Sequence, residues 1–473
     1  MRTKIVATLG PASSELAVMR AMVEAGVRIF RLNFSHACAA DFKPALANIK
    51  ILEAEFGLTL TPMADLCGPK LRIGEVEGSP RVVERGSKVL LGLAAMRERA
   101  KDAPFISLDD PGMLKGLAAG NPVSLSDGMI QFVVSLVIEP DQLFELEVQN
   151  SGSLVSHKGI AFPGRALSIP ALTAKDKRDI VEALAVGVDA AALSFVQSPQ
   201  DVIDLKRIIK ASGRNIPVIA KLERKPAVDS LDAILDQADG VMVARGDLGL
   251  EFPLPDLPVL QKRIIAACMA REKPVIVATQ MLLSMVQNPG PTRAEVTDVA
   301  NAIIDGADAV MLSEETAVGR YPVRAVEYMR DIAERAEAHA LARAGGPLRP
   351  AGEGDPERTL AYCACLLADQ VNAAGLLSHT RSGATARQVS ARRPRQPVYA
   401  LTPSREVRHV LNFCWGVVPS IADESVANHM DRCERFVQAS SKFEKGQSAV
   451  ITAGLATPGR SELHTNEVKV YFK

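Results

Sequence analysis

Short runs of apolar, often β-branched residues recur along the chain, and most are followed by a segment with helical spacing of its apolar positions. The first pattern is typical of buried strands and the second of amphipathic helices. The strand runs are 4–9, 27–32, 58–65, 190–195, 216–222, 240–244, 274–279 and 308–312. The helical segments are 14–25, 41–56, 174–186, 199–211, 227–237, 259–271, 293–305 and 322–344. This alternation favours an α/β fold, a closed (β/α)8 TIM barrel, over an open doubly wound sheet.

The alternation is interrupted between the third and fourth strand runs. Here period-two runs replace helical spacing, and Asp127-Gly128 between two of them suits a hairpin turn. The runs are 81–93, 122–126, 129–138 and 143–148. We expect a small all-β domain, 73–156, inserted into a barrel formed by 1–72 and 157–341. Inserted there, it can close like a lid over the barrel.

A Gly- and Pro-rich stretch near 342–356 is typical of a linker. Helical signals at 357–373 and 384–390 then alternate with strand signals. The strand signals are 375–378, 398–401, 449–453 and 467–472. They predict a separate C-terminal α/β domain, 357–473, so the chain of 473 residues would hold three domains.

Composition narrows the class of protein. Lys plus Arg and Asp plus Glu are 55 each, so the net charge is zero, and aromatic residues make up only 4%. Neither value favours a nucleic-acid or membrane partner. The seven cysteines are irregularly spaced without a CxxC pair, which indicates reduced thiols rather than disulfides or a zinc site. No stretch of 18 residues is apolar throughout, so we expect a cytoplasmic protein.

Polar side chains follow six of the eight strand runs. Each has an ordinary explanation as a solvated edge, a turn or a helix cap. In a barrel, however, the carboxyl ends of all strands meet on one face, so these residues would converge there. They are Arg31, Asn33, Ser35 and His36; Asp65 and Lys70; Lys221 and Glu223; Gly246 and Asp247; Thr279; and the run from Ser313 to Thr316.

The types of these residues indicate phosphoryl transfer. Glu223 and Asp247 offer carboxylate oxygens from adjacent strands, which suit Mg²⁺ or Mn²⁺. Lys221 is a point cation beside them, and the guanidinium of Arg31 can grip a phosphate. A divalent ion and two cations around one anion form a device for stabilising a phosphoryl group in transit. Neither a GxxxxGK[ST] loop nor a GxGxxG loop occurs, so a P-loop and a Rossmann fingerprint are not indicated.

These segments resemble those of pyruvate kinases over nearly the whole chain. The similar segments include KIVATLGPAS (4–13), FRLNFSH (30–36), VIAKLE (218–223), GVMVARGDLG (240–249) and VIVATQML (275–282). The resemblance implies transfer of the phosphoryl group of phosphoenolpyruvate to ADP, giving pyruvate and ATP in the last step of glycolysis. It also implies a homotetramer.

The resemblance carries roles over to individual residues. It implies Lys221, Arg31 and Thr279 as catalytic residues, and Glu223 and Asp247 as ligands of Mg²⁺ (or Mn²⁺). The substrate would contact Arg31, Gly246, Asp247 and Thr279. The nucleotide would contact Asn33, Ser35, His36, Arg72 and Lys158.

One departure from the family concerns the monovalent cation. Many relatives hold K⁺ at the position formed here by Asn33, Ser35, Asp65 and Lys70, and they carry Glu and Thr where this chain has Lys70 and Leu66. A K⁺ beside an ammonium would meet a repulsion of roughly a few kcal/mol at an effective dielectric of about 20. We therefore expect that K⁺ is not required. Ala161 also replaces an Asn that relatives carry near the nucleotide.

A candidate effector site lies in the C-terminal domain. Thr380, Ser382, Gly383 and Thr385 stand between a strand and a helix, where hydroxyls and free N–H groups can bind a phosphorylated effector. The same residues also suit an ordinary helix cap.

Three other functions remain open from the sequence. One is a Mg²⁺-dependent aldolase or lyase acting on pyruvate enolate, and another is a Schiff-base aldolase that uses Lys221. The third is a regulatory sensor that keeps the fold without catalysis, against which the presence of Lys221, Glu223 and Asp247 speaks.

Overall fold

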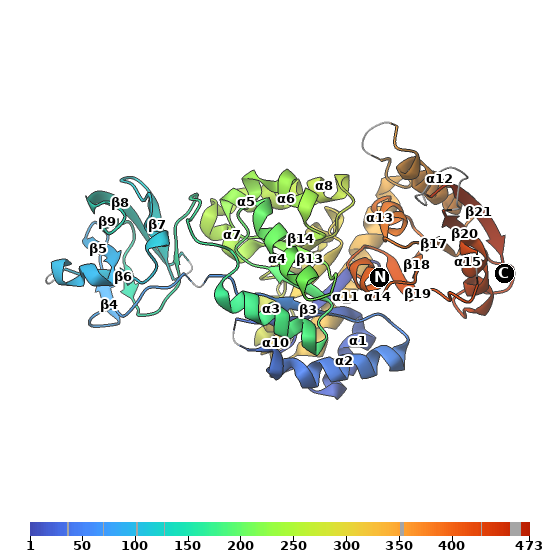
Figure 1. Ribbon diagram of the computed structural model, residues 1–473, viewed down its shortest axis with the longest axis horizontal. Helices are drawn as coiled ribbons and strands as arrows, with labels where there is room; N and C mark the ends of the chain where they lie inside the picture. The colour runs from blue at the N-terminus through green and yellow to red at the C-terminus, as the bar shows by residue number, and fades with distance from the viewer. Residues whose placement is uncertain are drawn as a thin grey trace.

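The chain is seen in a computed structural model that describes residues 1–35, 37–69, 71–100, 103–126, 128–350, 354–426, 428–454 and 465–473. His36, Lys70 and Asp127 lie outside the described residues, and so do the predictions made for them. Figure 1 shows three bodies in a row along the long axis: the inserted lid, the barrel in the middle and the C-terminal domain.

Within the described residues, eight parallel strands close into a barrel in the order β1-β16-β15-β14-β13-β12-β3-β2. Their bounds are β1 (Lys4–Thr8), β2 (Val27–Asn33), β3 (Thr61–Asp65), β12 (Ala190–Leu193), β13 (Val218–Leu222), β14 (Gly240–Ala244), β15 (Val275–Ala278) and β16 (Ala309–Leu312). The predicted TIM barrel is confirmed. Most of the strands are slightly shorter than the apolar runs, because the ends of those runs continue into the loops.

Helices surround this barrel. The longer ones are α1 (Leu16–Ala25), α2 (Lys43–Phe56), α3 (Ala174–Val186), α4 (Pro199–Ala211), α8 (Leu257–Ala270), α9 (Arg293–Ile304) and α11 (Pro322–Ala344). Short ones are η1 (Ala39–Phe42), α5 (Lys225–Asp229), α6 (Leu231–Gln237), α7 (Arg245–Glu251), η4 (Leu254–Asp256), η5 (Leu283–Val286) and α10 (Glu314–Ala317). The single helix expected over 227–237 is divided, since Ser230 leaves helical geometry between α5 and α6. Helix α7 was not predicted.

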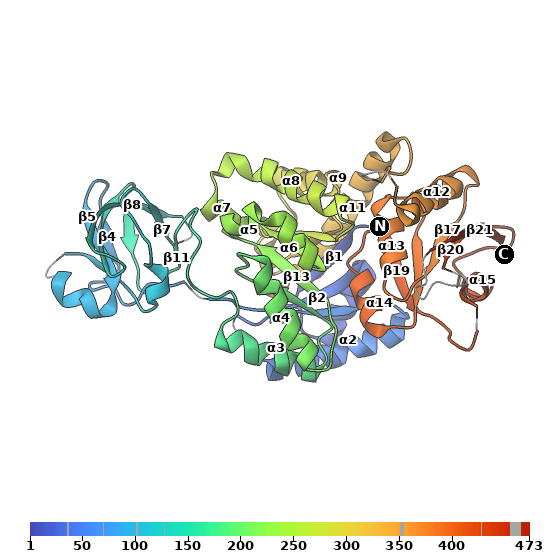
Figure 2. The ribbon, with the colours of Figure 1, turned by 45° about the horizontal axis from the view of Figure 1, so that its top comes forward.

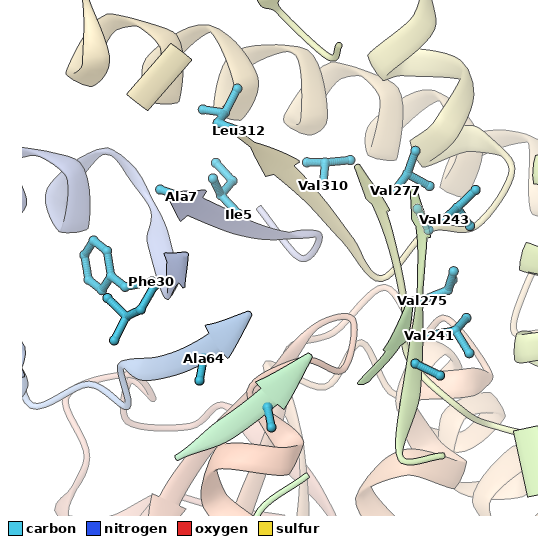
Figure 3. Packing of buried hydrophobic residues seen from close by; sticks show 14 of the residues in the cluster. Ile5, Ala7, Phe30, Ala64, Val241, Val243, Val275, Val277, Val310 and Leu312 are labelled. Carbon is cyan, nitrogen blue, oxygen red and sulfur yellow. The ribbon is translucent and has the colours of Figure 1, made fainter. Parts of the chain in front are cut away.

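Both faces of the barrel strands are buried. Ile5 and Ala7 belong to the apolar layer between strands and helices, whereas Val6 between them belongs to the layer inside the barrel. Figure 3 shows part of the outer layer, with Val241 and Val275 on neighbouring strands. Burial on both faces explains why the strands appear in the sequence as continuous apolar runs rather than as alternating ones.

The inserted lid lies between β3 and β12 and is built mainly of strands. They are β4 (Arg81–Val83), β5 (Lys88–Leu93), β6 (Phe105–Leu108), β7 (Pro122–Leu125), β8 (Ile130–Glu139), β9 (Leu143–Val148), β10 (Gly152–Leu154) and β11 (Ile160–Ala161). Two 3-10 turns, η2 (Ala94–Ala100) and η3 (Pro111–Met113), complete it. The run 81–93 forms two strands rather than one, and β6, β10 and β11 are too short to show a period in the sequence. Figure 2 shows the lid standing off one end of the barrel.

The C-terminal domain is a sheet in the order β19-β18-β17-β20-β21 with helices packed against it. Its strands are β17 (Gly375–His379), β18 (Val398–Thr402), β19 (Val417–Ile421), β20 (Ser448–Ala453) and β21 (Glu467–Phe472). Its helices are α12 (Pro356–Gln370), α13 (Ala384–Ala391), α14 (Arg405–Leu411) and α15 (His429–Ala439). The predicted α/β class is confirmed, although α14, β19 and α15 were not predicted. No helix in the described part of the chain has the length and apolarity needed to span a bilayer.

Phe413 of the C-terminal domain enters the apolar interior of the barrel. It is 1% exposed and clusters with Val6, Ile29 and Met63 on the inward faces of β1, β2 and β3. Next to it, the side-chain amide of Asn412 donates hydrogen bonds to the carbonyl oxygens of Arg28 (2.9 Å) and Thr59 (3.1 Å). The C-terminal domain therefore closes the amino-terminal end of the barrel, opposite the polar strand ends.

We expect the substitution Phe413→Ala to lower the free energy of unfolding by about 3–5 kcal/mol, because it leaves a cavity inside the barrel. Urea unfolding followed by circular dichroism measures this loss. The control Phe472→Ala removes a ring that is 64% exposed and should change stability by about 0.5 kcal/mol or less. Equal effects of the two substitutions would contradict the role of Phe413 as a plug.

Candidate active site

Lys221 lies at the centre of the polar cluster on the carboxyl-terminal face of the barrel. It is the fourth residue of β13, and Glu223 follows two residues later, so both side chains point to the same side. The ammonium Nζ of Lys221 is 2.8 Å from Glu223 Oε1 and 3.2 Å from Asp65 Oδ1. Its side chain is only 11% exposed. The predicted juxtaposition of Lys221 and Glu223 is therefore observed.

Arg31 reaches the same cluster from β2. Its Nε and Nη2 both lie 2.6 Å from Asp65 Oδ2, and its Nη1 donates to Thr8 Oγ1 at 3.1 Å. Residues of β1 and β3, the two neighbours of β2 in the barrel, thus fix the guanidinium. Asp65 bridges Arg31 to Lys221, with one oxygen for each cation.

This arrangement shifts two pKa values in opposite directions. Burial alone would lower the pKa of Lys221, but the carboxylates of Asp65 and Glu223 outweigh it and raise this pKa above its ordinary value. Burial alone would raise the pKa of Asp65, but Lys221 and Arg31 outweigh it and lower that pKa. At neutral pH the site therefore holds a charged ammonium next to a charged carboxylate.

Ser194 completes the environment of Lys221, and the sequence analysis missed it. Lys221 Nζ donates to Ser194 Oγ at 2.7 Å, and Ser194 Oγ donates in turn to the carbonyl oxygen of Leu66 at 2.7 Å. Ser194 directly follows β12, so the rule that singled out the other strand ends would also have found it. Ser194 orients the ammonium of Lys221 because it accepts a third contact from Nζ, besides those to Asp65 and Glu223.

Glu223 and Asp247 are the carboxylates expected to hold a divalent ion, and both line one cavity. Glu223 Oε2 accepts the backbone N–H of Phe195 at 2.7 Å. Asp247 was expected in a strand-end loop but lies in the first turn of α7, because the chain turns into a helix directly after β14. No third His, Cys, Asp or Glu in the described residues joins them as a metal cluster. The pair suits Mg²⁺, which commonly takes few protein carboxylates and completes its shell with substrate oxygens and water.

The cavity between barrel and lid has a volume of about 280 Å³. Its walls combine the cations Arg31, Lys221 and Arg224 with the carboxylates Asp65, Glu223, Asp247 and Glu251. Ser35, Ser194, Cys67 and the lid residues Ser124, Gly128 and Ala161 also line it. A larger hollow of about 890 Å³ lies beside α7, α8 and α9 and includes Arg245, Gly246 and Arg293, but not Lys221 or Glu223. The smaller cavity is therefore the candidate active site.

Thr279 lies next to Gly246 rather than in the wall of the small cavity. Its Oγ1 accepts the Gly246 N–H at 2.9 Å and donates to the Ala278 carbonyl at 2.6 Å. Thr279 and Gln280 have φ values of +68° and +53°, so the backbone at the end of β15 is strained. The hydrogen bond from Gly246 holds Thr279 against the first turn of α7.

The predicted nucleotide contacts are only partly brought together. Asn33 Oδ1 accepts the Ser35 N–H at 3.1 Å, and Ser35 lines the cavity. Arg72 donates to the carbonyl oxygen of His157 at 2.9 Å and pairs with Gly159. In the described residues the cavity lining includes neither Arg72 nor Lys158.

The candidate effector residues Thr380, Ser382 and Gly383 connect β17 to α13, and Thr385 is the second residue of α13. Thr380 Oγ1 accepts the N–H of Gly383 at 2.9 Å, and Ser382 Oγ accepts that of Ala384 at 3.4 Å. Thr385 Oγ1 lies 2.5 Å from Thr465 Oγ1. Gly383 has a φ of +83°, a conformation that favours glycine. These bonds form a compact turn ahead of a helix.

Comparison with known proteins places this chain among the phosphotransferases. Residues 1–326 match the family model "Pyruvate kinase, barrel domain", and residues 358–471 match "Pyruvate kinase, alpha/beta domain". The chain belongs to the pyruvate kinase family, and the predicted family and enzyme class are confirmed.

Named relatives agree with this assignment. Pyruvate kinase of Agrobacterium vitis is 41% identical over 476 residues, which cover 99% of this chain and 96% of the relative. Pyruvate kinase 2 of a Synechocystis strain is 40% identical over 455 residues, which cover 96% of this chain and 76% of the relative. Pyruvate kinase of Mycobacterium tuberculosis is 39% identical over 462 residues, which cover 97% and 96%.

We expect Asp65→Asn to destabilise the protein by about 3–5 kcal/mol at neutral pH, because Arg31 and Lys221 lose the carboxylate between them. Since the pKa of Asp65 is lowered in the folded protein, its contribution is complete above about pH 4 and is lost as the pH falls through the lowered value. The stability difference from the wild type should therefore be constant between pH 5 and 8 and narrow below about pH 4.

Urea unfolding at a series of pH values tests this expectation. The exposed Asp109 provides the control Asp109→Asn, which should follow the wild type at every pH. A difference for Asp65→Asn that grew on acidification would contradict the assigned ion pairs.

Proposed function

We propose that the cavity around Lys221 transfers the phosphoryl group of phosphoenolpyruvate to ADP and so forms pyruvate and ATP. The observation that carries the proposal is the ammonium of Lys221, held charged between Asp65 and Glu223 at the cavity wall. A buried, fixed positive charge stabilises negative charge that develops on a migrating phosphoryl group, at little cost of reorganisation.

The neighbouring groups take complementary roles in this proposal. Arg31, held by Asp65 and Thr8, contacts the transferring phosphate with its remaining N–H donors. Gly246 and Asp247 at the start of α7 bind the enolpyruvate part, and Thr279 stands beside the enolate. Asn33, Ser35, Arg72 and Lys158 contact the nucleotide, as does His36, which lies outside the described residues.

Glu223 and Asp247 would hold Mg²⁺ or Mn²⁺ in this proposal. When bound, the ion neutralises charge on the substrate and on the phosphoryl group. Both carboxylates line the cavity together with Lys221 and Arg31, which supports the assignment. The raised pKa of Lys221 speaks against a Schiff-base aldolase, because such an enzyme needs a neutral amine.

Replacing Lys221 with Met removes the central charge and should lower kcat by about 10³-fold or more. An assay coupled to lactate dehydrogenase, with phosphoenolpyruvate, ADP and Mg²⁺, measures the turnover. The control Lys210→Met changes an exposed lysine of α4 and should keep kcat within about 2-fold. Turnover by Lys221→Met near that of the wild type would refute the role of Lys221. Borohydride trapping of pyruvate on the wild type would favour the aldolase instead.

The proposed enzyme does not require K⁺. Asp65, one of the residues at the expected cation position, already directs its two oxygens to Arg31 and Lys221. Leu66 is buried and carries no hydroxyl in place of the Thr of many relatives. Both features support the expectation drawn from Lys70.

Wild-type turnover in Tris buffer should therefore change by less than about 2-fold when tetramethylammonium chloride is replaced by KCl at equal ionic strength. The double substitution Leu66→Thr with Lys70→Glu restores the residues of K⁺-dependent relatives. It should turn over faster in KCl than in tetramethylammonium chloride. A strict K⁺ requirement of the wild type would refute the proposal.

Effector binding and assembly remain proposals as well. Thr380, Ser382 and Gly383 form a turn ahead of α13, and Thr385 lies in the first turn of that helix. This arrangement supports binding of a phosphorylated effector there. A homotetramer and a cytoplasmic location are supported by membership of the family.

A further inference from the structure

A buried ion pair lies directly beside the two carboxylates proposed to hold the metal. Arg224 Nε is 2.6 Å from Glu251 Oε1, and the two side chains are 6% and 2% exposed. Arg224 follows Glu223 in the sequence, and Glu251 lies four residues after Asp247 on α7. Residues four apart on a helix lie on the same face. The ion pair therefore connects Arg224, the neighbour of Glu223, to α7, the helix that carries Asp247.

The same pair holds the chain where it returns from the lid to the barrel. Glu251 Oε2 accepts the N–H of Gly164 at 3.0 Å and that of Lys225 at 3.3 Å. Arg224 Nη2 donates to the carbonyl oxygen of Arg165 at 3.0 Å. Gly164 and Arg165 follow β11, the last strand of the lid. The ion pair of Arg224 and Glu251 thus joins three parts of the molecule: the segment after β13, helix α7, and the residues Gly164 and Arg165 that follow the lid.

Phe195 links Arg224 back to Glu223. The guanidinium carbon of Arg224 lies 4.6 Å from the centre of the Phe195 ring, a cation–π distance. Phe195 has a φ of +61°, and its N–H donates to Glu223 Oε2 at 2.7 Å. Phe195 thus contacts Arg224 with its ring and Glu223 with its backbone N–H.

We propose that Arg224 and Glu251 are positioning residues that set the separation of Glu223 and Asp247 and connect it to the lid. The inference rests on the proposed function, since it assigns the ion to Glu223 and Asp247. Groups that hold metal ligands in place affect metal affinity strongly, typically by 10–100-fold when they are changed.

The substitution Glu251→Gln keeps the shape of the side chain and removes its charge. We expect the Kd for Mn²⁺, measured by electron paramagnetic resonance without substrate, to rise by about 10-fold or more. The apparent KM for Mn²⁺ in turnover should rise in parallel. The loss of kcat at saturating Mn²⁺ should be smaller than the rise in the Kd for Mn²⁺, because Lys221 and Arg31 are unchanged. A group that merely stabilises the fold would not produce this split.

Arg224 supplies a second test. Arg224→Met should weaken Mn²⁺ binding as Glu251→Gln does, and Arg224→Lys should recover part of the affinity because it keeps the charge. The double variant Arg224→Met with Glu251→Gln should bind Mn²⁺ no more weakly than whichever single variant binds it less well. The reason is that both substitutions break the same ion pair, the one between Arg224 and Glu251. If Glu251→Gln does not fold, the comparison of Arg224→Lys with the wild type decides the question.

A buried ion pair away from the cavity provides the matched control. Glu272 and Arg392 are 3.0 Å apart, with side chains 9% and 4% exposed, and neither lines the cavity. Glu272→Gln should lower the melting temperature as Glu251→Gln does but leave the Kd for Mn²⁺ within about 2-fold. Unchanged Mn²⁺ affinity in Glu251→Gln, or equal weakening in Glu272→Gln, would overturn the proposal.

The Mn²⁺ titration separates this inference from the proposed function, because it needs no turnover. A wild type that binds Mn²⁺ but does not use phosphoenolpyruvate would refute the function, while a raised Kd in Glu251→Gln would still support the positioning role. A wild type that turns over normally, with a Glu251→Gln variant of unchanged Kd, would refute the positioning role alone.

Discussion

The bridge that Asp65 makes between Arg31 and Lys221 is the interaction around which the carboxyl-terminal face of the barrel is arranged. Two cations this close would repel each other and lose their solvation in a buried site. Asp65 resolves this conflict because it offers one oxygen to each, and Glu223 takes a second direction around the ammonium. The positive charges are thereby fixed in place before any substrate arrives. Such fixed charge is what catalysis of phosphoryl transfer demands.

The two ends of the barrel have different tasks. The carboxyl-terminal end collects charged side chains and borders the lid, whereas the amino-terminal end is closed by Phe413 of the C-terminal domain. The apolar layer inside the barrel lies between them, and close-packed interiors transmit small shifts instead of absorbing them. The C-terminal domain therefore packs, through Phe413, against the strands that carry Arg31, Asp65 and Lys221. It lies far from these strands in sequence.

Most of the fold was predictable because both faces of the barrel strands are buried and the helices are amphipathic. An apolar run such as 240–244 predicts a buried strand from its own residues alone, and β14 has the same bounds as that run. The predictions were poorer where elements are short. The sequences of strands β6 and β11 show no hydrophobic period. Helix α7 begins without a loop after β14, and for that reason Asp247 was assigned to a strand end rather than to a helix. Short elements exist because of their tertiary contacts and leave little trace in the local pattern.

The sequence by itself determined the class of fold and the set of charged residues at the strand ends, because side-chain periodicity and residue type are local properties. It also indicated that Lys221 and Glu223 share one side of a strand. Only the tertiary structure decided that Asp65 lies between two cations, that Ser194 orients the ammonium and that Arg224 pairs with Glu251. Those contacts join residues distant in the chain. They depend on how the barrel closes and how its strands are aligned, which no local pattern encodes.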